Sequence, residues 1–156
     1  MTQKAYQIKT IRLHPAEQRI IEKACSALND LDRTTLMTDA AVFHAIRLGI
    51  YYGADAPPPL TSSWPYVPER GDEATSERIS ISMNAIAEEL IGKAARHVHT
   101  SDPLFIIGST LAYIGRLQAC YTGSERATPE EAVEIKKKLQ AIKLPAQYQY
   151  ARKGQK

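Results

Sequence analysis

The chain has 156 residues, of which 44% are apolar and 24% are charged, and its formal net charge is +3. This length suits one compact domain, and this composition excludes a wholly disordered chain. The mild positive charge permits an anionic partner without requiring one, and the sequence contains neither a cysteine spacing typical of zinc sites nor a glycine cluster typical of phosphate-binding loops.

The first part of the chain predicts a strand followed by two helices. Residues 7–14, QIKTIRLH, alternate between polar and apolar side chains, with Ile11 and Leu13 on the apolar face. Pro15 suits the first turn of a helix whose apolar residues continue at helical spacing to residue 31. The segment DRTT interrupts that pattern. We therefore expect a second helix to begin near Thr38 as its N-cap and to end at Gly53.

Residues 54–76 form a connection that is rich in proline. They hold five of the nine prolines in the chain, so a long regular element is not expected there. Trp64 and Tyr66 are bulky apolar groups that a freely disordered linker rarely carries. We expect this connection to lie against the body of the domain.

The strand–helix–helix pattern then occurs a second time. In RISISM, the residues Ile79, Ile81 and Met83 share one face of a strand. Asn84 is a suitable N-cap for the next helix, and Ser101 for the one after it. Residues 7–53 and 77–121 are therefore interpreted as two diverged copies of one unit, with about seven extra residues in the first copy.

The last segment, residues 122–156, predicts one helix and a basic tail. Thr128, Pro129 and Glu131 have the spacing of a capping box with proline in the first turn, and the helix should end before Pro145. Its positive charges either lie on a solvated helix end or add sequence-independent contacts to phosphates. The residues considered for such contacts are Lys136, Lys137, Lys138, Arg152 and Lys153.

Two such units can complete each other. A single unit leaves its strand unpaired, whereas two strands can pair antiparallel and pack their apolar faces on four helices. The predicted fold is one domain over residues 1–156, mainly α-helical, with one two-stranded antiparallel β-ribbon and a C-terminal helix. The other face of the ribbon would be open and would carry Ile8, Thr10, Arg12, Arg78, Ser80 and Ser82.

This order of elements resembles the ribbon-helix-helix family of DNA-binding proteins. RISISMNAIAEEL is similar to the family's strand of alternating polar residues that leads into the first helix. Most members form the ribbon from two chains. Here both halves lie on one chain, as in TraY-type conjugation accessory proteins and related relaxosome proteins. The resemblance implies a single-chain, pseudo-twofold protein that binds double-stranded DNA sequence-specifically.

The resemblance also implies roles for particular residues. Thr10, Arg12, Arg78, Ser80 and Ser82 would read base edges in the major groove, and Ile8 would contact a thymine methyl group. The N-termini of the second helices, at Thr38 and Asp39 and at Ser101 and Asp102, would hold phosphates. Two features depart from the pattern. Lys9 occupies an inward position, and the two aspartates would repel a phosphate.

The biological role expected from the resemblance is accessory binding near a DNA-transfer origin, with a relaxase or another transfer or regulatory protein as partner, or transcriptional repression. The alternative is a protein-interaction module, such as an adaptor or antitoxin-like inhibitor, with a merely solvated ribbon face. We expect a cytoplasmic protein with reduced thiols, because no signal core or membrane span is visible. The four histidines form no catalytic set, so we expect no enzymatic activity, metal, cofactor or small-molecule substrate.

Overall fold

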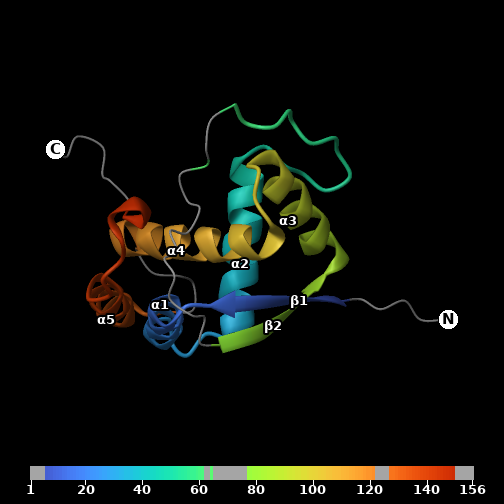
Figure 1. Cartoon of the computed structure of the whole chain (residues 1–156). Coiled ribbons are helices and arrows are strands. Elements are labelled where there is room, and N and C mark those ends of the chain that lie inside the picture. The colour runs from blue at the N-terminus through green and yellow to red at the C-terminus, as the bar shows by residue number, and fades with distance from the viewer. Residues whose placement is uncertain (1–5, 62–63, 65–76, 122–126, 150–156) are drawn as a thin grey trace.

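The computed structural model describes residues 6–61, 64, 77–121 and 127–149 (Figure 1). Within these residues the protein is mainly helical with one two-stranded antiparallel sheet, which confirms the expected fold class. The elements in chain order are β1 (Tyr6–Leu13), α1 (Pro15–Ala27), α2 (Arg33–Arg47), β2 (Glu77–Asn84), α3 (Ala85–His97), α4 (Asp102–Cys120), α5 (Pro129–Gln140) and the short 3₁₀ helix η1 (Ala146–Tyr148).

The β1–β2 ribbon has one buried and one exposed face. Thr10 lies opposite Ser80 in the antiparallel register, and Ile11 lies opposite Ile79. All five apolar side chains predicted to face inward are buried: Ile11, Leu13, Ile79, Ile81 and Met83. The alternation in both strands therefore predicted the faces of the ribbon correctly, because a side-chain period of two allows only two phases.

The helices of the two units pack across each other. α2 and α4 contact each other, and each also contacts the first helix of the other unit, α3 and α1 respectively (Figure 1). The buried centre includes Leu36 and Met37 from α2 and Phe105, Ile106 and Ile107 from α4. Neither unit encloses a core by itself, so the two units together form one hydrophobic core.

The start of the second helix differs from the prediction. Asp32, rather than Thr38, is the N-cap of α2, and its carboxylate accepts a hydrogen bond of 3.1 Å from the backbone N–H of Thr35. Thr38 and Asp39 lie inside the helix. The segment DRTT is thus a helix start, because an aspartate can satisfy the first free N–H groups.

With Asp32 as the N-cap of α2, the first unit contains no insertion relative to the second. The N-caps of α1 and α3, His14 and Asn84, are 70 residues apart. The N-caps of α2 and α4, Asp32 and Ser101, are 69 residues apart. The two units therefore correspond almost residue by residue, and the prediction of seven extra residues is wrong.

The described part of the proline-rich connection packs on the second unit. Trp64 is buried and its ring stacks on Phe105, with 4.9 Å between ring centroids. The backbone N–H of Leu60 donates to the carbonyl of His97 at 2.9 Å, and the ring of His99 bonds the carbonyl of Leu60. This confirms that Trp64 attaches the connection to the body, whereas Tyr66 lies outside the described residues.

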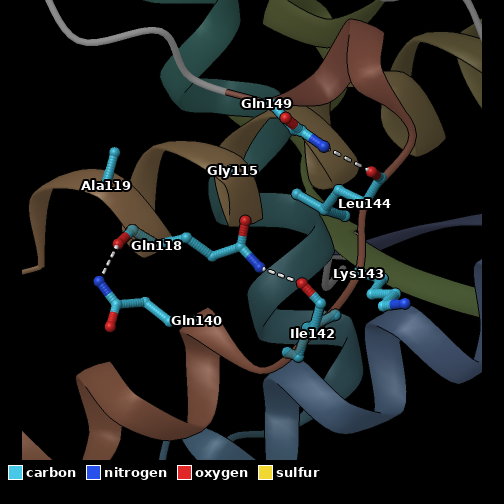
Figure 2. Close-up of a pocket in the computed structure, with 8 residues that line it drawn as sticks. All are labelled: Gly115, Gln118, Ala119, Gln140, Ile142, Lys143, Leu144 and Gln149. Atoms are coloured by element: carbon cyan, nitrogen blue, oxygen red, sulfur yellow. Dashed lines mark hydrogen bonds between the residues drawn. The ribbon is translucent and has the colours of Figure 1, made fainter.

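The C-terminal segment packs on α1 and α4. α5 begins with the predicted capping box, in which Thr128 and Glu131 exchange hydrogen bonds of 2.8 and 3.1 Å, and it ends before Pro145. Figure 2 shows Gln118 of α4 reaching the chain after α5, where its amide donates to the carbonyl of Ile142 at 2.7 Å. The backbone of Tyr148 approaches Gly115 so closely that a Cβ at residue 115 would collide with its carbonyl oxygen.

Candidate functional site

The exposed face of the ribbon brings together the six residues that were predicted to read DNA. We call Ile8, Thr10, Arg12, Arg78, Ser80 and Ser82 the outer ribbon face. All six side chains are exposed, and Ile8 is 65% exposed. Two of the six carry a positive charge and none carries a negative one. The face therefore carries five side chains that can donate hydrogen bonds, two of them cationic, and one exposed isoleucine.

One cross-strand pair on this face consists of two positively charged residues. Arg12 lies directly opposite Arg78, Thr10 opposite Ser80, and Ile8 opposite Ser82. Like charges that face each other across two strands destabilise the pair. An anion or a row of acceptor atoms placed over this end of the face could bond both arginines, since each guanidinium presents a planar fork of donors.

Lys9, whose inward position departed from the family pattern, forms an ion-pair network. Its ammonium Nζ lies 3.1 Å from a carboxylate oxygen of Asp102 and 3.6 Å from one of Glu88. The hydrogen bond to Asp102 is the largest influence that raises the pKa of Lys9, against a smaller effect of burial. Lys9 thus joins β1 to the start of α4 and to α3, a contact that only the unexpected lysine could have signalled.

The N-terminus of α4 lies where the sequence placed it. The hydroxyl of Ser101 accepts a hydrogen bond of 3.3 Å from the backbone N–H of Leu104, and Ser101 is exposed. Asp102 follows it, and its charge is balanced by Lys9. The repulsion that Asp102 would exert on a phosphate is therefore reduced.

The prediction of a helix N-terminus that holds a phosphate at Thr38 and Asp39 is wrong. Both residues lie inside α2, where the backbone N–H groups bond within the helix, so no helix N-terminus is present there to hold a phosphate. Partial burial raises the pKa of the Asp39 carboxyl. The equivalent helix start is at Asp32, whose carboxylate already accepts a hydrogen bond from the backbone N–H of Thr35.

The basic residues considered for auxiliary contacts are only partly described. On α5, Lys137 and Lys138 are exposed, and Lys136 is half-buried. Lys137 also lies 3.9 Å from the carboxylate of Glu134. Arg152 and Lys153 lie outside the described residues. α5 packs against α1 and α4, so these charges belong to the flank of the helical body.

His44 and the two cysteines differ in their burial. Burial lowers the pKa of His44 to about 4, with smaller contributions from the positive charges of Arg47 and Arg116. Cys25 is buried, and burial raises the pKa of its thiol to about 11. Cys120 is exposed, and both thiols are free. Within the described ranges, no three His, Cys, Asp or Glu side chains cluster to hold a metal ion.

A cavity of about 650 Å³ lies among the α1–α2 turn, α2, α4 and α5. Three aspartates contribute to its lining, Asp30, Asp32 and Asp39, and among the described residues no basic side chain does. The remaining lining residues are Leu28, Asn29, Leu31, Leu36, Tyr113, Leu117, Tyr121 and Ile135. The cavity is thus acidic and largely apolar, in contrast to the outer ribbon face.

In comparisons with protein-family models, curated proteins and solved structures, no match to this chain was found. In the part of the chain that the structure describes, the helices are too short or too polar to cross a membrane.

Proposed function

We propose that this protein binds double-stranded DNA sequence-specifically by placing the β1–β2 ribbon in the major groove. The observation that carries the proposal is the outer ribbon face, with its opposed arginines and three hydroxyl side chains on one exposed surface. A two-stranded ribbon fits the major groove, where each base pair presents a distinct pattern of donors and acceptors. The likeness of the strand–helix–helix order to the ribbon-helix-helix family supports the same proposal.

Each side chain has a chemical role in this proposal. Arg12 and Arg78 would each bond the O6 and N7 atoms of a guanine, while the hydroxyl groups of the face would serve several bases. Ile8 would lie against the C5-methyl group of a thymine. None of these contacts involves a covalent step, so the proposed function requires no enzymatic activity.

The start of α4 would fix the ribbon against the DNA backbone. The positive end of the helix dipole and exposed Ser101 would favour a phosphate there. Lys9 supports this role because it balances the charge of Asp102. Contacts of this kind position a protein on DNA and do not carry sequence information.

The proposed biological role follows the resemblance. A single-chain ribbon suits a cytoplasmic accessory factor that marks a site near a DNA-transfer origin and presents it to a relaxase or another transfer protein. Transcriptional repression from an operator is the other role of such a DNA binder. Both roles require the same binding reaction, which is therefore the step to test.

The binding test is a fluorescence-anisotropy titration with Arg78→Ala. On a duplex selected by the wild-type protein, loss of a bidentate guanine contact should weaken binding by about 1–3 kcal/mol. Arg19→Ala removes an exposed arginine of α1 and serves as the matched control. Equal losses for both variants, or equal loss on selected and random duplexes, would argue against base reading by the ribbon.

The second candidate function is a protein-interaction module, and the acidic cavity favours it. Its apolar walls and three aspartates suit an amphipathic segment of a partner that carries lysine or arginine beside apolar residues. Asp39→Asn and Leu117→Lys should then abolish binding of a leucine–lysine model helix measured by calorimetry. Unchanged binding, or equal binding of a leucine–glutamate helix, would reject this candidate.

A further inference from the structure

The correspondence of the two units defines a pseudo-twofold relation within the ribbon. The N-caps of the helices that follow the two strands, His14 and Asn84, correspond at an offset of 70 residues. At the same offset Thr10 corresponds to Ser80, and these two residues are also direct partners across the strands. The pseudo-twofold axis therefore passes through the Thr10–Ser80 pair, at the centre of the outer ribbon face.

This axis relates positions whose side chains differ. It exchanges Arg12 with Ser82, and it exchanges Ile8 with Arg78. A ribbon made from two identical chains would carry the same residue at both members of each exchange. Here the Arg12–Arg78 pair lies on one side of the axis, and the Ile8–Ser82 pair lies on the other.

The two ends of the outer ribbon face thus have opposite chemistry. One end carries two guanidinium groups, and the other carries an isoleucine that is 65% exposed beside a serine. The two pairs are four residues apart along each strand, or roughly 13 Å at the rise of a β-strand. Base pairs repeat about every 3.4 Å along the duplex, so both ends reach one major groove a few base pairs apart.

We infer that the DNA site is bipartite, an inference that rests on the proposed function. The Arg12–Arg78 end selects G·C pairs, because guanine offers two acceptors to an arginine fork. The Ile8–Ser82 end selects A·T pairs with a thymine methyl group against Ile8. The hydroxyl groups of Thr10 and Ser80 tolerate several bases between the two ends. The site has a direction, and the protein binds it in one orientation.

Selection from random duplexes, followed by sequencing, tests the inference. The wild-type protein should enrich guanine positions on one side of a tolerant centre and thymine-containing A·T pairs on the other. Ile8→Ala should relax the A·T preference alone, and Arg78→Ala should relax the guanine preference alone. Enrichment of a palindrome, or an equal effect of either variant on both ends, would overturn the bipartite site while leaving DNA binding intact.

Exchange of the end pairs makes the test sharper. The double variant Ile8→Arg, Ser82→Arg should select guanines at both ends and give a palindromic site. The opposite double variant, Arg12→Ser with Arg78→Ile, should lose the guanine preference and bind the wild-type site at least about tenfold more weakly. All four positions are exposed, so circular dichroism serves to confirm that each variant is folded. Wild-type site preference in both variants would overturn the inference.

Failure of the proposed function has a different signature. If the wild-type protein enriches no sequence at low salt, DNA reading itself is wrong and the bipartite site falls with it. If the protein enriches one sequence whose two halves are alike, only the bipartite site is wrong. The two proposals are therefore separated by the same experiment.

Discussion

At the scale of single residues, we expect Arg12 and Arg78 to favour the proposed DNA binding at the expense of stability. Residues 12 and 78 are direct partners on the exposed side of the ribbon, and like charges at opposed positions of two strands tend to destabilise the pair. A solvated surface has no need of that arrangement, whereas a surface that meets the negative groove of DNA does. Functional sites commonly keep such destabilising groups, and their replacement tends to raise stability at the expense of activity.

Arg78→Thr should therefore stabilise the free protein. Removal of the opposed charge and introduction of a β-branched residue should raise the free energy of unfolding by a few tenths of a kcal/mol, about 0.5 at most. Chemical denaturation at low salt measures this change, and the same variant should lose affinity for the selected duplex. A lower free energy of unfolding would show that the opposed arginines do not repel.

His44 should make the free energy of unfolding depend on pH. Because burial lowers its pKa from 6.5 to about 4, the unfolded chain binds a proton at a higher pH than the folded protein does. The free energy of unfolding should fall as the pH drops from 6.5 to about 4, and this contribution should level off below that.

The total contribution of His44 is on the order of 3 kcal/mol at most. Urea denaturation across this pH range measures it, with His44→Phe as the variant that lacks the titrating group. The wild-type curve should be steeper than the variant curve between the two pH limits. Parallel curves would contradict the burial of a neutral His44.

At the scale of elements, the strands and most helix starts could be predicted from the sequence. The alternation in β1 and β2 identified the six residues of the outer ribbon face, since a strand has only two faces. The start of α2 was misplaced because Asp32 and Thr38 are both good caps, and local propensity does not decide between them. The Lys9–Asp102 pair was missed because it joins residues that only the packed units bring together.

The N-cap of α2 can be tested by a matched pair of substitutions. Asp32→Ala should lower the free energy of unfolding by about 1 kcal/mol, because the N–H of Thr35 loses its acceptor. Thr38→Ala should change it by less than about 0.5 kcal/mol, because residue 38 caps no helix. Thermal and chemical unfolding measure both. A larger loss for Thr38→Ala than for Asp32→Ala would indicate that the helix begins at residue 38.

At the scale of the whole molecule, the proline-rich connection and α5 pack at equivalent positions of the two units. At the offset of α2 and α4, Phe105 corresponds to Leu36. Trp64 of the connection stacks on Phe105, while Ile135 of α5 lines a cavity with Leu36. The pseudo-twofold body is thus covered by different segments on its two sides. Repetition within the sequence could not have predicted them, since neither segment belongs to the repeat.

The packing of the C-terminal segment predicts different costs for two helical glycines. Gly115→Ala should destabilise the protein by about 1–3 kcal/mol, because the new Cβ displaces the backbone at Tyr148. Gly92→Ala meets only ordinary contacts and should be neutral or stabilising by up to about 1 kcal/mol. Denaturation curves of both variants measure the difference. Similar values would contradict the approach of η1 to α4.

Whether the ribbon is the face that binds DNA can be measured by NMR titration. A duplex selected by the wild-type protein is added to labelled protein, and amide shifts are followed along the described residues. We expect the largest changes at residues 8–12 and 78–82, with smaller changes at the start of α4. Largest changes around the acidic cavity or on α5, with the ribbon unaffected, would contradict it.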